Sequence, residues 1–270
     1  MYNSERSRSG HSDYCVAGFA PRLHRSGHMR PILFRLGRMN VRAYPAFLFL
    51  GLTFGAIAGT YWGIAAGLDS TRLYAGLLLL IIPALAGSRL LFVATHWQYY
   101  RDRPSEIFST SSGGAALYGG LLLALAVSVP LLRILRLPFG VFWDAAAITL
   151  LVGMVFTKIG CLLNGCCAGR PSSSWIAVNL PNQSGVWCRR VPSQLLEFGL
   201  AVVLLAGALL WKDRPFDGAV FLTSVAIYAT ARLPLGATRE KIDRMGSINI
   251  YNVISVSLLV ACIAAIALLR

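Results

Sequence analysis

Charged residues are scarce in this chain of 270 residues, and acidic ones are the scarcest, since 11 Asp and Glu stand against 25 Lys and Arg. The charged fraction is 13%, whereas soluble domains carry roughly 25%. Histidine is also rare, with four in the whole chain, while 56% of the residues are hydrophobic. This composition excludes an ordinary soluble domain and predicts an integral membrane protein.

The sequence has no separate polar domain, and its net charge of +14 is scattered over short segments between apolar runs. Nucleic-acid-binding proteins gather Lys and Arg on one face, so this scatter argues against such a partner. Contact with anionic lipid head groups is the better interpretation. No internal repeat of fixed period is evident, which argues against a solenoid or a duplicated transporter.

Residues 1–28 lack the continuous apolar core of a signal peptide and are rich in Ser, Arg and His. We predict a disordered or mis-started N-terminal extension, because Met29 would be a natural beginning; a transit-like role is the rival interpretation. Residues 29–270 are expected to form a single transmembrane domain.

From Tyr44 onward the apolar runs are each long enough to cross a bilayer core of about 30 Å. They predict an all-α integral membrane protein with about seven transmembrane helices around a central lipid-binding cavity. Lys and Arg are more frequent after the second, fourth and sixth spans, which favours a cytoplasmic N-terminus. The spans are expected near residues 45–67, 73–96, 113–135, 139–164, 193–211, 217–235 and 248–269.

Several charged residues interrupt these apolar runs, where charge is costly and therefore indicates function. Lys158 opens a segment with three cysteines and three glycines. Arg89 has two interpretations: an inward-facing pair with Asp144 or Glu197, or direct contact with a lipid phosphate. Glu197 opens a span, where the helix dipole alone favours a carboxylate. We expect Lys158, Arg89 and Arg232 to converge around a lipid phosphate.

Spacing groups other polar residues on shared helix faces. Gln194 and Glu197 are three residues apart, and Tyr228 and Arg232 are four apart. Tyr118 precedes Gly119 and Gly120, which have two interpretations. The two glycines allow close packing of helices, or they leave the backbone accessible to a ligand beside the phenol of Tyr118.

The cysteines leave three interpretations open. Neighbouring Cys166 and Cys167 rarely bond to each other, but one of them can reach Cys188 on an oxidising face. A four-thiolate zinc site that includes Cys161 lacks the usual CxxC spacing. The third interpretation is small-residue packing, which also suits Cys262. We expect no metal ion and no cofactor.

Taken together and in order, these stretches resemble the prolipoprotein diacylglyceryl transferase family, from about Met29 to the C-terminus. The matching pieces are residues 41–44, Gly87-Ser-Arg89, Tyr118-Gly-Gly, Asp144, Lys158-Ile-Gly, Asn164-Gly165, Gly169, Pro192-Ser-Gln-Leu-Leu-Glu197, Tyr228 to Arg232, and Arg239-Glu240.

The resemblance implies a multi-pass enzyme of the bacterial inner membrane with its N-terminus outside, contrary to the charge count. It implies transfer of a diacylglyceryl group from phosphatidylglycerol to the thiol of a prolipoprotein lipobox cysteine, with release of glycerol phosphate. The expected partners are phosphatidylglycerol, the prolipoprotein signal peptide and membrane lipids, with no nucleic acid.

The resemblance also implies the residues of the site. The expected catalytic residues are Lys158, Arg232 and Tyr118. The expected substrate-binding residues are Tyr44, Arg89, Gly119, Gly120, Cys161, Asn164, Gly165, Cys166, Gly169, Gln194, Glu197, Tyr228 and Arg239.

The sequence departs from the family pattern at several of these positions. A histidine of the pattern is Tyr118 here, an arginine is Lys158, an asparagine is Cys161 and a glutamate is Cys166. Candidate bases are therefore fewer and thiols more numerous. Two alternatives follow: a membrane thiol protein that uses the cysteines for metal or disulfide chemistry, and an inactive phospholipid-binding relative.

Overall fold

A computed structural model describes residues 32–37, 39–102, 104–107, 116–182, 186–239 and 249–269. The predictions about residues 1–28 and about Glu240 therefore lie outside the described residues. Seven described helices are long and apolar enough to cross a membrane, and their bounds lie within four residues of the predicted spans. They are α2 (Ala43–Ala65), α3 (Ser70–Thr95), α5 (Leu117–Leu135), α6 (Phe139–Asn164), α7 (Ser193–Leu210), α8 (Ala219–Ala237) and α9 (Ile250–Leu269). The prediction of a helical, multi-pass membrane protein is thus confirmed.

Short elements that the sequence did not predict precede the first long helix or connect the long helices. The shorter elements are β1 (Ile32–Leu36), β2 (Met39–Arg42), α4 (Trp97–Tyr100), the 3-10 helix η1 (Pro104–Glu106), β3 (Val178–Pro181) and β4 (Trp187–Arg190). β1 pairs antiparallel with β2, and β3 pairs antiparallel with β4. Each strand has only four or five residues, which is too short for a period-two pattern to stand out from the sequence.

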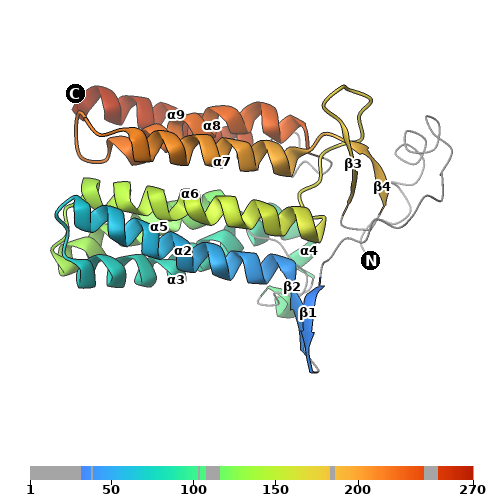
Figure 1. The fold of residues 1–270 in the computed structure, drawn as a ribbon, viewed down its shortest axis with the longest axis horizontal. Helices are drawn as coiled ribbons and strands as arrows, with labels where there is room; N and C mark the ends of the chain where they lie inside the picture. Colours follow the sequence, from blue (N-terminus) through green and yellow to red (C-terminus); the bar gives the residue numbers. More distant parts are fainter. Residues whose placement is uncertain are drawn as a thin grey trace.

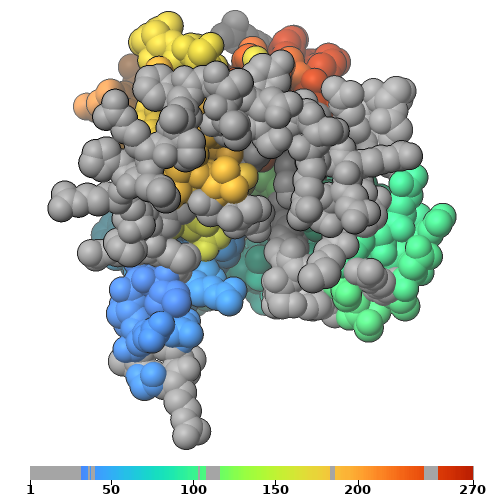
Figure 2. All heavy atoms as spheres, turned by 90° about the vertical axis from the view of Figure 1, so that its right-hand side faces the viewer, coloured from blue at the N-terminus to red at the C-terminus, as the bar shows by residue number. Residues whose placement is uncertain are grey.

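The long helices run side by side, with α7, α8 and α9 on one side and α2, α3, α5 and α6 on the other (Figure 1). Helix α6 joins the two groups, because it packs against α2 and also against α7 and α8. Both hairpins lie at the end of the bundle where α2 begins and α6 ends, here called the hairpin end. Figure 2 shows this end, with the β1–β2 hairpin projecting from the bundle and the segment around α4 and η1 at another edge.

Glycines allow close approach at two helix interfaces. A Cβ at Gly55 or Gly59 of α2 would overlap backbone oxygens of α6. Gly87 of α3 and Gly119 of α5 face each other, and a Cβ on either would collide with the carbonyl oxygen of the other. Small residues let the backbones pack closely in the absence of a hydrophobic driving force between lipid-embedded helices.

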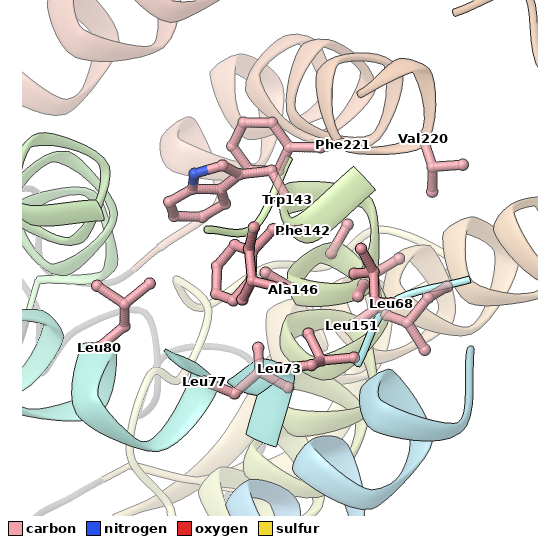
Figure 3. Close-up of a cluster of buried hydrophobic side chains, with 14 of the residues drawn as sticks. Leu68, Leu73, Leu77, Leu80, Phe142, Trp143, Ala146, Leu151, Val220 and Phe221 are labelled. Carbon is pink, nitrogen blue, oxygen red and sulfur yellow. The ribbon is translucent and has the colours of Figure 1, made fainter. Parts of the chain in front are cut away.

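The opposite end of the bundle holds an apolar core (Figure 3). Phe142 and Trp143 of α6 are buried, and the Trp143 ring lies 4.7 Å from that of Phe221 in α8. The buried carboxylate of Asp144 accepts N–H bonds from Gly218 at 3.0 Å and Phe221 at 2.9 Å. Asp144 therefore caps the first turn of α8 from α6, and the predicted pairing of Arg89 with Asp144 is wrong.

Candidate functional site

Four charged side chains, three from helices and one from the segment after α8, meet at the hairpin end. Glu197, just beyond the first turn of α7, pairs with Lys158 of α6, with Arg232 of α8 at 3.6 Å and with Arg239 at 2.5 Å. The Glu197 side chain is 1% exposed, and those of Lys158 and Arg232 are 12% and 11% exposed. We call Lys158, Glu197, Arg232 and Arg239 the charge cluster.

Backbone contacts hold Arg239 in place just beyond the end of α8. Gly169 and Arg239 form an isolated antiparallel bridge, and the N–H of Arg170 donates to Thr238 O at 2.7 Å. The hydroxyl of Ser193 lies 2.9 Å from that of Thr238, which ties the start of α7 to the same loop. A Cβ at Gly169 would collide with Val191 O, so only glycine fits this crossing of the chain.

The charge cluster carries a surplus of positive charge, because three cations surround one carboxylate and leave a net charge of +2. Burial alone would lower the pKa of Arg239, but the Glu197 carboxylate outweighs that effect and raises the pKa above its usual value. Among the described residues, no group accepts a hydrogen bond from Arg232 Nη1 or Arg239 Nε. Surplus charge and unused N–H donors together suit a phosphate-sized anion.

Arg89 does not belong to the charge cluster, so the expected convergence of three cations is wrong for this residue. Its guanidinium donates to Ile107 O at 2.8 Å, Glu106 O at 2.9 Å and the Tyr100 hydroxyl at 3.3 Å. The Glu197 carboxylate, its other predicted partner, is occupied by Lys158, Arg232 and Arg239. Arg89 thus fastens the segment from α4 to η1 onto α3.

Three tyrosines and a serine lie together near the hairpin end, and two of them, Tyr118 and Ser255, are buried. The hydroxyl of Tyr118 lies 2.6 Å from that of Ser255 in α9. Its ring centroid lies 6.4 Å from the Tyr228 ring, edge to face, and 6.4 Å from the Tyr251 ring. Tyr228 precedes Arg232 by one helical turn, which links this group to the charge cluster. Sequence reasoning missed Tyr251 and Ser255, whose only signal is their four-residue spacing within an apolar run.

Three thiols gather where α6 ends. The sulfur atoms of Cys161, Cys166 and Cys167 all lie within 4.8 Å of one another, and we call them the thiol trio. Gly165 ends the helix with φ +69°, and Cys167 also adopts a left-handed backbone with φ +59°. Cys166 and Cys167 form no disulfide, so the bridge to Cys188 that the sequence left open is not formed. Among the described residues, the group of thiols at this place has three members, not the four of a four-thiolate site.

The three thiols share their protons unequally. Hydrogen bonds from Cys161 and Cys166 hold the pKa of Cys167 well below its usual value, and the charges of Arg239 and Lys158 act in the same direction. A hydrogen bond with Cys161 lowers the pKa of Cys166, but the bond with Cys167 and burial outweigh it and raise the pKa to about 11. The pKa of Cys167 is therefore lower than that of Cys166.

Polar groups from neighbouring elements hold the loop that carries the trio. The Gln194 amide donates to Cys166 O at 2.9 Å, and the Asn164 side chain bonds the Cys166 thiol. Tyr44, at the start of α2, packs against Gly160 and interacts with the sulfurs of the trio. The structure thus brings Tyr44, Asn164 and Gln194 to the trio.

The remaining predicted glycines occupy structural positions. Gly119 and Gly120 face the backbone of α3, where a Cβ at Gly120 would meet Ala84 O at 2.7 Å. Helix packing, the first of the two interpretations, accounts for both. Gly165 supplies the left-handed turn at the end of α6.

One buried cation was missed from the sequence. Arg190 of β4 is 1% exposed and donates to Gly169 O at 3.4 Å. It supports the same crossing of the chain that holds Arg239. The loop between α6 and α7 gave no periodic pattern, so the sequence held no signal for this burial.

Known proteins are similar in sequence to this chain over most of its length. The family profile described as prolipoprotein diacylglyceryl transferase matches residues 31–268. The phosphatidylglycerol–prolipoprotein diacylglyceryl transferase of Dehalococcoides mccartyi is 29% identical over 220 residues, covering 79% of this chain and 83% of the relative. The enzyme of that name from Clostridium botulinum is 26% identical over 236 residues, covering 84% of this chain and 94% of the relative. The resemblance inferred from the ordered motifs is confirmed.

Proposed function

Because the chain belongs to the prolipoprotein diacylglyceryl transferase family, we propose that it transfers the diacylglyceryl group of phosphatidylglycerol to a prolipoprotein cysteine. The observation that carries this proposal is the charge cluster, whose net charge of +2 is largely buried at one end of a membrane bundle. A phospholipid places its phosphate at the surface of the bilayer, level with the end of such a bundle, where few other anions are found.

The chemistry places its greatest demand on the leaving group. The acceptor thiolate attacks the carbon of the diacylglyceryl group that is bonded to a phosphate oxygen. A C–S bond forms while that C–O bond breaks. Glycerol phosphate leaves with the electron pair. Cations fixed where that charge develops lower the barrier, and removing one such donor in other enzymes costs about 10²–10³-fold in rate. Lys158 and Arg232 take this role, with Arg239 in support.

The acceptor must lose its thiol proton before the attack. A positive field stabilises the thiolate and lowers its pKa, so the charge cluster assists this step as well. The phenol of Tyr118 stands next to Tyr228. It relays the proton from the thiol to the departing glycerol phosphate, whose oxygen gains the negative charge. The acceptor cysteine belongs to a lipobox peptide that approaches the hairpin end.

The relatives come from bacteria, and this chain is proposed to reside in the bacterial inner membrane. The family's orientation puts the start of α2 outside, and with it the hairpin end and the charge cluster. This orientation agrees with prolipoproteins that present their cysteine at the outer surface.

Transfer is tested with purified protein in vesicles of phosphatidylglycerol and a lipobox peptide, by the mass that the peptide gains. The wild type is expected to add one diacylglyceryl group, and Lys158→Ala about 100-fold more slowly. Arg133→Ala is the matched control, because Arg133 is exposed in the last turn of α5. A correctly inserted wild type that binds phosphatidylglycerol without modifying the peptide would be an inactive lipid-binding relative, and the proposal would fail.

A further inference from the structure

We propose that Cys161, Cys166 and Cys167 bind one soft metal ion, Cu(I), in three-coordinate geometry at the end of α6. This inference goes beyond lipid transfer and does not depend on it. The sequence alone led us to expect no metal, because the spacing of these cysteines lacks a CxxC motif. The turn at the end of α6 brings the three sulfur atoms together, which the spacing of the cysteines in the sequence does not show.

The sulfur positions fit a trigonal complex with little rearrangement. The three atoms lie within 4.8 Å of one another. Metal–thiolate bonds of about 2.3 Å would place three coplanar sulfurs about 4.0 Å apart. Rotation about the Cα–Cβ bonds can make so small a contraction without moving the backbone.

The ligand set selects the ion. Zn²⁺ in structural sites takes four ligands in a tetrahedron, and the group contains no histidine or carboxylate among the described residues. Thiolates favour soft ions, and Cu(I) is stable with three of them. A trio with no fourth protein ligand therefore fits Cu(I) better than Zn²⁺.

The surrounding charge favours the complex. Three thiolates and one Cu(I) sum to −2, which equals in size the +2 surplus of the charge cluster. The positive charges of Lys158 and Arg239 act directly on the Cys167 sulfur. A charged metal–thiolate group in a poorly hydrated site requires such compensation, and the chain supplies it from the adjacent helices.

The trio is both preformed and accessible. Two left-handed residues, Gly165 and Cys167, turn the chain so that it folds back onto Cys161. Gln194 fixes the loop by its bond to Cys166 O. Cys161 is 3% exposed, whereas Cys166 and Cys167 are partly exposed, so an ion can enter from the loop side and seat against the buried sulfur.

Two variants of the full chain test the site with equal numbers of cysteines. One retains the trio and carries Cys15→Ser, Cys188→Ser and Cys262→Ser. The other retains those three and carries Cys161→Ser, Cys166→Ser and Cys167→Ser. Under anaerobic conditions in detergent, Cu(I) is titrated against the chelator bathocuproine disulfonate. The first variant is expected to take one Cu(I) per chain from the chelator, and the second at least 100-fold less tightly. Equal binding by both variants would overturn the proposal.

X-ray absorption on the Cu(I)-loaded wild type provides a second measurement that does not depend on how the variants fold. A first shell of three sulfurs is expected. A shell of two sulfurs, or one with nitrogen or oxygen, contradicts the site, and tighter binding of Zn²⁺ than of Cu(I) overturns the choice of ion. Both experiments use protein without lipid or peptide, so their outcome is separate from that of the transfer assay.

Discussion

Glu197 Oε1 and Arg239 Nη2 lie 2.5 Å apart in the structure, although 42 residues separate them in the chain. Glu197 lies near the start of α7 and Arg239 follows α8, so this contact closes the hairpin end of the bundle. Lys158 and Arg232 complete the group around the same carboxylate. The pairing explains how a membrane helix tolerates Glu197, and the surplus cations explain what the group can bind.

Glu197→Gln is expected to destabilise the fold. The change leaves three cations together with no carboxylate, and removing one partner of a buried ion pair typically costs about 3–5 kcal/mol. Thermal unfolding in detergent measures the loss. The control is Asp102→Asn, since Asp102 pairs with Arg101 at an exposed site where ion pairs contribute about 0–1 kcal/mol. Equal melting temperatures for the two variants would contradict the charge cluster as described.

Asp144→Ala is expected to loosen the start of α8. The change leaves the N–H groups of Gly218 and Phe221 buried without an acceptor, at about 1–3 kcal/mol for each group. Asp144→Asn keeps one acceptor oxygen and should cost less. Hydrogen exchange at residues 218–222 measures the effect. Unchanged protection there in Asp144→Ala would show that the cap does not hold α8.

Arg89→Ala is expected to free the segment from α4 to η1 and to leave the charge cluster intact. Arg89 bonds two carbonyls and a phenol of that segment, and lysine cannot reproduce this fork of contacts. Limited proteolysis between residues 97 and 107 should therefore rise in both Arg89→Ala and Arg89→Lys. Loss of phospholipid binding without greater cleavage would instead indicate direct contact with the lipid.

Tyr118→Phe and Ser255→Ala separate the role of the phenol from that of its hydrogen bond. Both variants break the 2.6 Å contact, but only the first removes the phenolic proton. We expect at least a 10-fold lower transfer rate for Tyr118→Phe and a change within about 3-fold for Ser255→Ala, given the usual size of proton-transfer effects. Equal rates in the two variants would remove the phenol from the mechanism.

Apolar length was enough to predict the spans, because each run must cover a bilayer core. It could not predict the partners of the charged residues, since these depend on which helices are neighbours. Lys158 and Glu197 meet because α6 and α7 pack together. The partners predicted for Arg89 were wrong because its real partners lie in a short irregular segment that has no sequence pattern. The three cysteines of the thiol trio are close together in the sequence. Their sulfurs meet only because the chain turns through left-handed conformations at Gly165 and Cys167.

The central claim is that Lys158 and Arg232, with Arg239, hold a lipid phosphate. Native mass spectrometry of the detergent-solubilised protein tests it with phosphatidylglycerol and with diacylglycerol, which lacks the phosphate. The wild type is expected to retain phosphatidylglycerol at least 10-fold more than diacylglycerol, and Lys158→Ala/Arg232→Ala to lose that preference. Equal retention of the two lipids by the wild type, or an unchanged preference in the double variant, would contradict the account.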